Sequence, residues 1–394
     1  MRILVVQESG YLERGPHQGH HLLERMVLRG HDVHVIDYPI DWAHQTGKGL
    51  APPWEIHAKA FKVVAPGVTV IRPIIIRLPI LNYLSLLVSH RIEIANQIRM
   101  FNPDVIVGFG LLNARMAIRQ GRYNGIPFVY YVIDELHRLV PEAPLRSIAK
   151  HIESGNCRMA TSVLSINQGL MEYTESMGAD PSKTSIIRAG VDFKRFSSAD
   201  GSKIRQKYGF KDNDTVLFFM GWTYNFCGLD AVAEQLVASG RKDVKLLVLG
   251  KGELWEKLQA IRAENGLEDK MVLEGWKPYS EVPSYIAAAD ICLLPAQRNE
   301  IMQNIVPIKM YEYLAAGKPV IATDLPGIMK EFGQGNGVEY VSAPADAFKK
   351  SVELAISGRV GELGKKAQEL VCKNDWDIIV DQFEDALRPL QRKG

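Results

Sequence analysis

Short runs of valine, isoleucine and leucine alternate with longer amphipathic stretches along the whole chain. Short apolar runs that recur between helical patterns are typical of parallel strands covered on both faces by helices. The predicted strands are 3–6, 33–36, 105–107, 128–132 and 163–166 in the first half, and 216–220, 245–249, 271–273, 291–294 and 320–321 in the second. The pattern therefore predicts an α/β protein built from two doubly wound, Rossmann-like domains.

A polar segment of small residues separates the two sets of strands. Residues 187–196 lead into Ser-Ser-Ala-Asp-Gly-Ser at 197–202, a composition typical of a linker. We place the boundary near residue 195. The predicted domains are thus 1–195 and 196–373, followed at 374–394 by a last helix that folds back on the first domain.

Composition and charge narrow the class of protein. The 394 residues suffice for two domains of about 150 residues, each with its own core. Basic and acidic residues number 47 and 45, a net charge of +2, which argues against a nucleic-acid partner. Cysteines occur singly, at Cys157, Cys227, Cys292 and Cys372. We therefore expect neither a disulfide framework nor a zinc site. We expect the protein to be located in a reducing cytoplasm.

One stretch, residues 59–99, departs from this balance of charge. It holds six basic residues against one acidic residue, Glu93, and it includes the most apolar run of the chain, 74–88. That run is shorter than the ~20 residues that a membrane-spanning helix needs. Its composition fits a strand and a helix of the core whose arginines reach water, and it also fits a face that docks on a membrane surface. Both interpretations stay open.

The segment 304–321 carries a pattern that points to a binding site. Pro307 suits a helix start and Ala-Ala-Gly at 315–317 suits its end, so we expect a helix over about 307–316. Its N-terminus would reach the carboxyl edge of a parallel sheet, where free backbone N–H groups favour a phosphate. Lys309 would lie in its first turn, and Glu312 within reach of a ribose. The same spacing also fits a surface lysine and glutamate.

This segment resembles the signature of family 4 retaining glycosyltransferases of the GT-B fold, in the variant Pro-x-Lys-x-x-Glu-Tyr followed by Ala-x-Gly-Lys-Pro-Val-Ile. Further landmarks that agree in order are 218–221, 228–230, 245–252, 274–276 and 288–295, and, in the first half, 30–33, 126–127 and 190–196. The likeness covers nearly the whole chain. It implies a GT-B architecture, in which an acceptor-binding and a donor-binding domain face each other across a cleft.

The resemblance also implies an activity, the transfer of a hexosyl group from a nucleotide-activated donor to an acceptor hydroxyl with retention of configuration. The nucleotide-sugar is a substrate, and no cofactor or metal is expected. The leaving phosphate would take the acceptor proton, so the protein orients the reactants and stabilises charge. The residues implied at the reaction centre are Asn304, Glu312, Asp134 and His137. The residues implied in donor binding are Gly15, Gly19, Arg188, Gly221, Trp222, Lys251, Ile305, Val306, Lys309 and Glu312.

The chain departs from the family pattern at three positions. Asn304 stands where the family commonly has a second glutamate, and its amide can hydrogen-bond a sugar but carries no charge. Trp222 and Cys227 stand where an arginine and a lysine hold the donor diphosphate. Hydrogen bonds to charged groups contribute ~1.5–3 kcal/mol each. We therefore expect Lys309, Lys251, Arg188 or the backbone N–H groups at 305–309 to replace them, unless the donor differs from the usual one.

The loop 8–21 after the first predicted strand and the segment after the fourth hold further candidates. Gly15 and Gly19 would allow a donor phosphate close to the backbone. The adjacent His20 and His21 point apart, and no carboxylate cluster accompanies them, so we expect no metal site. Asp134 contacts the sugar or acceptor in one interpretation and caps a helix in the other.

The expected partners are a nucleotide-sugar donor and a glycan or lipid-linked acceptor, with peripheral contact through 59–99 at the inner face of the membrane. Two alternatives remain at this level. One is a sugar-nucleotide epimerase or hydrolase of the same architecture, and the other is a non-catalytic protein that binds a sugar-nucleotide.

Overall fold

The computed structural model describes residues 1–13, 15–38, 50–78, 81–140, 142–299 and 302–392. Residues 79–80 of the apolar run and 300–301 before the predicted helix at 307–316 lie outside this range. The chain divides into two compact units, Met1–Ala189 with Trp376–Gly394, and Gly190–Asp375. The divisions thus fall at 189/190 and 375/376. The sequence had predicted them at 195/196 and 373/374.

The first unit is built on an eight-stranded sheet with the order β3-β4-β2-β1-β5-β6-β7-β8. All neighbours are parallel except β3 and β4, which are antiparallel. Its strands are β1 (Arg2–Val6), β2 (Asp32–Ile36), β3 (Glu55–Ala60), β4 (Val68–Arg72), β5 (Val105–Gly108), β6 (Phe128–Val132), β7 (Ser162–Ser165) and β8 (Thr184–Ile186). Every residue of β5 and β6 is buried, because helices cover both faces of the sheet.

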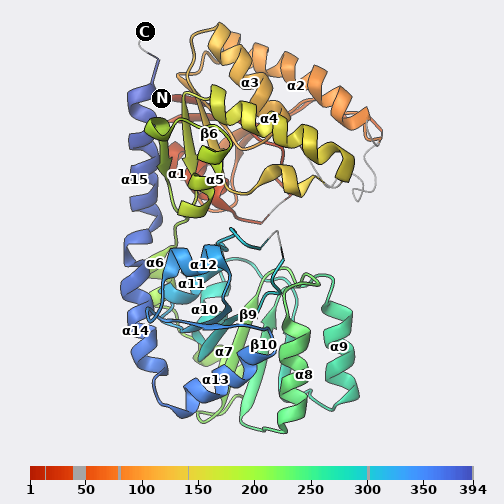
Figure 1. Cartoon of the computed structure of the whole chain (residues 1–394), viewed down its shortest axis with the longest axis vertical. Helices are drawn as coiled ribbons and strands as arrows, with labels where there is room; N and C mark the ends of the chain where they lie inside the picture. Colours follow the sequence, from red (N-terminus) through yellow and green to blue (C-terminus); the bar gives the residue numbers. More distant parts are fainter. Residues whose placement is uncertain (14, 39–49, 79–80, 141, 300–301, 393–394) are drawn as a thin grey trace. The chain divides into compact units, whose positions relative to one another are not determined.

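Helices of the first unit pack in neighbouring pairs. The helices are α1 (Gln18–Leu28), α2 (Leu81–Met100), α3 (Leu112–Tyr123), α4 (Arg146–Met159), α5 (Gln168–Ser176) and α15 (Trp376–Leu387). Helix α2 packs against α3, α3 against α4, and α1 against α15 (Figure 1). Phe383 and Leu387 of α15 are fully buried within this unit. The sequence-predicted last helix is therefore present, and it lies against α1.

The second unit holds a six-stranded, all-parallel sheet with the order β11-β10-β9-β12-β13-β14. Its strands are β9 (Thr215–Met220), β10 (Val244–Leu249), β11 (Met271–Glu274), β12 (Ile291–Leu294), β13 (Val320–Thr323) and β14 (Val338–Val341). Its helices are α6 (Phe193–Ser197), α7 (Ser202–Lys207), α8 (Leu229–Ser239), α9 (Trp255–Glu264), α10 (Val282–Ala287), α11 (Ile308–Ala315), α12 (Pro326–Phe332), α13 (Asp346–Ile356) and α14 (Val360–Val371). A continuous apolar core joins the strands to α8, α9 and α13.

The predicted α/β class and the ten predicted strands are confirmed, and four strands were missed. Strand β8 has only three residues. Strand β3 lies at the sheet edge, and its residues alternate between half-buried and exposed over most of its length. Strand β4 is a buried strand inside the stretch 59–99. The core interpretation of that stretch holds for β4, whereas Leu84, Val88 and Ile92 of α2 are 55–62% exposed.

Candidate active site

Each sheet has one place where the strand order reverses, and loops there lie at the carboxyl ends of the central strands. In the second unit β9 has β10 on one side and β12 on the other, so the chain leaves β9 and β12 toward opposite faces of the sheet. Ligands of open parallel sheets bind at such a reversal. The loops concerned are 221–228 and 295–307, which contain or precede most of the predicted donor-binding residues.

Helix α11 begins at this edge, one residue from where the sequence placed it. Pro307 is its N-cap, with φ −68° and ψ 136°, instead of lying in its first turn as predicted. The hydroxyl of Tyr313 accepts a hydrogen bond of 2.8 Å from the backbone N–H of Met220. That contact fixes α11 against the end of β9. The first turn of the helix, which carries Lys309, thereby lies beside the loop that follows β9.

Lys309 lies against the end of β9. Its Nζ donates a hydrogen bond of 3.0 Å to the carbonyl oxygen of Met220 and lies 4.1 Å from the centre of the Phe219 ring. Removal from water lowers the pKa of Lys309 to about 8, although the nearby Cys227 and Glu312 favour its charged form. An ammonium group that has lost much of its hydration binds a phosphate with little further desolvation.

Glu312 lies one turn further along α11 and is almost fully buried, with 5% of its surface exposed. The hydroxyl of Tyr279 donates a 2.7 Å hydrogen bond to its Oε1. Burial raises the pKa of Glu312 to about 7, while Tyr279, Lys309 and Arg195 act to lower it. The Arg195 guanidinium in turn stacks 5.2 Å from the centre of the Tyr279 ring and donates to the Tyr279 carbonyl oxygen at 3.3 Å.

Arg195 and Tyr279 were missed by the sequence analysis. Arg195 belongs to the segment interpreted as a linker, and Tyr279 follows β11 just beyond the landmark 274–276, at a position to which the sequence analysis gave no role. Only the tertiary fold brings them to Glu312. Because no local signal distinguishes such residues, a prediction from the segment 304–321 alone stops at Lys309 and Glu312.

Two exposed tryptophans lie beside the donor-binding positions after β9 and β10. Trp222 and Trp276 are 48% and 58% exposed, with ring centres 5.8 Å apart. Gly221 has φ +114°, and a Cβ there would lie 3.4 Å from Nζ of Lys309. Lys251 is exposed, with its Nζ 5.1 Å from the centre of the Trp255 ring. An indole therefore occupies the place of the family's arginine, and Nζ of Lys309 lies beside the preceding residue, Gly221.

The loop before α11 holds the remaining predicted residues of this unit. Asn304 and Ile305 are half-buried and Val306 is buried. A Cβ at Gly327 would lie 2.9 Å from the Cα of Asn304, so the backbones of this loop and of α12 are in close contact. The N–H of Gly327 donates to the carbonyl oxygen of Gln303 at 2.7 Å. The position of Asn304 is thus set by α12 as well as by α11.

In the first unit, three histidines fix the loop after β1 and the start of α1 in place. His17 caps α1 by accepting from the N–H of Gly19 at 3.2 Å, and Nε2 of His20 lies 2.8 Å from the carbonyl oxygen of Tyr11. Burial lowers the pKa of His20 to about 4. His21 stacks on Trp376 at 4.1 Å. The three histidines therefore serve packing and capping. Gly15 has open space where a Cβ would lie.

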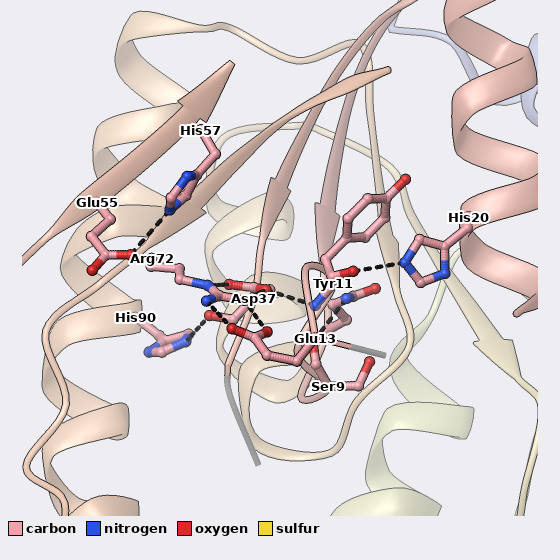
Figure 2. Close-up of polar contacts among 10 residues, drawn as sticks. Ser9, Tyr11, Glu13, His20, Asp37, Glu55, His57, Arg72 and His90 are labelled. Atoms are coloured by element: carbon pink, nitrogen blue, oxygen red, sulfur yellow. Dashed lines mark hydrogen bonds and ion pairs between the residues drawn. The ribbon is translucent and has the colours of Figure 1, made fainter. Parts of the chain in front are cut away.

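A buried ion-pair network holds the same loop to the sheet (Figure 2). Arg72 of β4 donates through Nε and Nη2 to Asp37 at 2.8 and 2.7 Å, and through both Nη atoms to Glu13 at 2.6 Å. Asp37 also accepts from the N–H of Tyr11 at 2.8 Å. Burial works against the charge on Arg72, but the hydrogen bonds to Glu13 and Asp37 outweigh it and raise its pKa.

Arg188 lies near the start of α1 in this unit. Nε2 of Gln18, the neighbour of Gly19, donates to the backbone oxygen of Arg188 at 3.1 Å. It also donates to the hydroxyl of Tyr131 at 2.7 Å. The structure thus brings the predicted positions Gly19 and Arg188 close together.

His137 follows β6 and is oriented by a buried glutamate. Its Nδ1 lies 2.8 Å from Oε2 of Glu153 and 2.9 Å from the hydroxyl of Tyr173. Glu153 also accepts from the backbone N–H groups of Leu136 and His137 at 3.2 Å. The N-cap position of this turn is Glu135, the residue after Asp134. With Nδ1 engaged, Nε2 is the nitrogen that a ligand would meet.

Two further findings concern the residues that the structure describes. Among them, no group of three or more histidine, cysteine, aspartate or glutamate side chains is placed to hold a metal ion. Of the helices in the same part of the chain, none is both long and apolar enough to cross a membrane.

Comparison with known proteins places this geometry in a family. The model described as Glycosyltransferase Family 4 matches residues 19–195, and that of Glycosyl transferases group 1 matches 200–371. The structure of HepE from Anabaena in complex with UDP superposes with a TM-score of 0.74 at 16% identity, covering 99% of this chain and 100% of that one.

Two curated relatives match parts of the chain. The 2-deoxystreptamine glucosyltransferase of Streptomyces kanamyceticus is 28% identical over 165 residues, 40% of this chain and 41% of that protein. The UDP-Gal:alpha-D-GlcNAc-diphosphoundecaprenol alpha-1,3-galactosyltransferase of Escherichia coli is 23% identical over 218 residues, 52% of this chain and 54% of that protein. The matches thus span about half the length of these relatives. They do not favour an epimerase or hydrolase. The chain belongs to the family 4 glycosyltransferases of the GT-B fold.

Proposed function

We propose that the protein transfers a hexosyl group from a nucleotide-linked donor to an acceptor hydroxyl with retention of configuration. The observation that supports this most strongly is the convergence of Lys309 and Glu312 with Tyr279 and Arg195 at the strand-order reversal of the second unit. A cation and a carboxylate one helical turn apart suit the phosphate and the vicinal hydroxyls of a nucleotide.

The donor is held by the second unit in this proposal. Lys309 and Lys251 supply positive charge to the diphosphate, with the backbone N–H groups around Ile305 and Val306, and Arg188 of the first unit is a further candidate. Glu312 accepts the ribose hydroxyls and Asn304 bonds the sugar. The exposed indoles of Trp222 and Trp276 offer a flat surface on which a nucleobase can stack, an interaction of about 1–3 kcal/mol per base.

The reaction breaks the bond between the anomeric carbon and the phosphate oxygen and forms a bond from that carbon to the acceptor oxygen on the same face. The acceptor proton passes to the departing phosphate oxygen. The protein accordingly supplies orientation and charge stabilisation and no strong base. Lys309, as a fixed cation, takes the part that a metal ion plays in other transferases, so the proposed activity needs no metal.

The acceptor in this proposal is a lipid-linked or surface glycan. The name of the E. coli relative specifies a diphosphoundecaprenol acceptor. Asp134 and His137 act on the acceptor or on the transferred sugar, and Glu153 with Tyr173 fixes the ring of His137 so that Nε2 faces the ligand. The protein contacts the inner membrane face through the stretch 59–99.

The test is binding followed by product analysis. Calorimetry against UDP-, GDP-, ADP- and dTDP-sugars is run on the wild type, on Glu312→Ala and on the control Glu268→Ala, which changes an exposed glutamate of the same unit. One donor class should bind the wild type and the control and be lost in Glu312→Ala. Nuclear magnetic resonance of the product, with and without a chelator, then reads the anomeric configuration. An inverted product, or loss of activity on chelation, contradicts the proposal.

A further inference from the structure

A groove between α2 and α3 of the first unit has none of the residues of the proposed reaction in its walls. It has a volume of about 1090 Å³, and its walls include Leu87 and Ile92 from α2 and Met116 from α3. It extends to Tyr123 and Asn102, which precede β6 and β5 at the amino edge of the sheet. The loops of the candidate active site lie at the opposite, carboxyl edge.

Four arginines converge on this groove, Arg91 and Arg99 from α2, Arg119 from α3, and Arg392. All four are exposed. Arg99 donates a hydrogen bond to Asn96 and Arg392 donates one to Asn102, and both acceptors are neutral side chains. In the part of the chain that the structure describes, none of the four has a carboxylate partner and no acidic side chain lines the groove.

The one acidic residue of α2 is turned away from this charge. Glu93 is buried and accepts hydrogen bonds from the indole N–H of Trp54 at 3.2 Å and from Gln97 at 2.8 Å. The charges of Arg91 and Arg99 are therefore not neutralised from within α2, and α3, which carries Arg119, has no acidic residue. A concentration of uncompensated positive charge attracts anions.

Large apolar side chains extend the groove along α2. Leu84, Val88 and Ile92 are 55%, 62% and 57% exposed, and they recur every four residues on one side of the helix. Met100 and Tyr123 at the other end are 77% and 91% exposed. A helix that presents an apolar stripe beside a basic groove has the composition of a surface that lies in a lipid headgroup layer.

We infer that the α2–α3 groove binds the phosphate groups of anionic lipids, while Leu84, Val88 and Ile92 enter the boundary of the acyl chains. The inference deepens the membrane contact within the proposed function, moving it from the whole stretch 59–99 to one groove and adding Arg119 and Arg392. Charge complementarity decides the occupant. A zwitterionic surface would leave the four guanidinium groups uncompensated, and a soluble polyanion would leave the apolar stripe in water.

The experiment is sedimentation of the full chain with vesicles of phosphatidylglycerol and phosphatidylethanolamine at low and high salt. The variant Arg91→Gln/Arg119→Gln is compared with a control, Arg122→Gln/Lys242→Gln, that removes two exposed charges outside the groove. Each basic residue at an anionic surface changes partition about fivefold. We expect the groove variant to lose about 25-fold in partition, the control to lose much less, and salt to weaken binding of the wild type.

The apolar part is tested by Val88→Ser/Ile92→Ser against the control Ile148→Ser/Ile356→Ser, whose residues are at least as exposed on average and lie outside the groove. Only the first pair should reduce binding. Equal binding to purely zwitterionic vesicles overturns the inference, and so does binding to heparin without binding to vesicles. Nucleotide binding, measured on the same samples, reports on the proposed function separately, because its sites lie at the carboxyl edges of the sheets.

Discussion

Lys309 and Glu312 are both ionisable groups whose charged forms the fold disfavours. Burial lowers the pKa of Lys309 to about 8 and raises the pKa of Glu312 to about 7. Both groups are therefore predominantly charged only between about pH 7 and pH 8. A bound nucleotide would supply a phosphate to one and hydroxyl groups to the other. These two residues have the properties of a binding site rather than those of a stabilising ion pair.

Glu312→Gln is expected to stabilise the free protein in a pH-dependent way. The pKa of Glu312 is raised from 4.5, so its ionised form destabilises the fold as pH rises from about 4.5 through about 7. Since one pKa unit corresponds to ~1.4 kcal/mol, the free energy of unfolding of the variant should exceed that of the wild type by about 3 kcal/mol at pH 8. At pH 4.5 this difference should vanish. Urea unfolding at both pH values measures it, and an equal difference at both would contradict the assignment.

The residues of the candidate site differ in how far the sequence could predict them. Lys309 and Glu312 share a short helix with a proline start, so their relation follows from local spacing. Arg195 and Tyr279 are 117 and 33 positions away from Glu312 along the chain, and no local sequence pattern indicates that they lie close to it in the fold. The roles of Asn304, His137 and the other implied residues remain predictions.

At the scale of single elements, the turn that begins α8 depends on one glycine. Gly228 has φ +71°, and a Cβ there would lie 1.9 Å from the carbonyl oxygen of Pro295, which follows β12. Gly240 at the end of the same helix has φ +62° but open space around it. The first position combines backbone strain with a backbone clash, and the second has the strain alone.

Gly228→Ala should therefore cost far more stability than Gly240→Ala. We expect about 1 kcal/mol for Gly240→Ala, the ordinary cost of a left-handed alanine, and more than 3 kcal/mol for Gly228→Ala, because the loop after β9 must move off β12. Thermal unfolding of the two variants side by side measures the difference. Similar losses would mean that Gly228 approaches Pro295 less closely than the structure has it.

The loop after β1 depends on Arg72, and its removal tests that dependence. Arg72→Met leaves the buried Asp37 without its partner, which typically costs about 3–5 kcal/mol. The control Arg241→Gln breaks an exposed pair with Asp243, for which less than ~1 kcal/mol is expected. Chemical denaturation measures both. A loss in Arg72→Met no larger than that of the control would show that the network does not hold the loop.

The elements themselves were predictable wherever burial is complete. Strands such as β5, β6 and β12 are apolar throughout because both faces are covered, and each was predicted. Strand β3 lies at a sheet edge with few apolar residues, and its antiparallel pairing with β4 has no counterpart in the pattern of parallel strands. Strand β8 is too short to show any period.

At the scale of the whole molecule, the first unit is discontinuous in sequence. Helix α15 follows the second unit along the chain but packs on α1, where Trp376 stacks on His21 and lies 5.6 Å from the guanidinium of Arg25. Trp376 is 1% exposed. The last helix therefore contributes core to the unit that the chain left 186 residues earlier.

Trp376→Ala should destabilise the first unit and spare the second. Removing a buried tryptophan typically costs about 3–5 kcal/mol, whereas Ile378→Ala changes a side chain of the same helix that is 42% exposed. Hydrogen exchange followed by mass spectrometry locates the loss. Protection should fall in β1, α1 and β6 for Trp376→Ala and stay unchanged for Ile378→Ala. A loss confined to β9–β14 would contradict the assignment of α15 to the first unit.

The placement of α15 also orders events while the chain is being made. Translation delivers residues 1–189 first, yet the surface of α1 that receives Trp376 stays uncovered until the ribosome has released the second unit. The second unit is contiguous in sequence, so it can complete its core as soon as it leaves the ribosome. Until then the first unit keeps an apolar surface exposed, to which chaperones can bind. Fusing the segment 376–392 ahead of residue 1 would reverse that order, and folding yield after synthesis would reveal how long the nascent first unit is exposed.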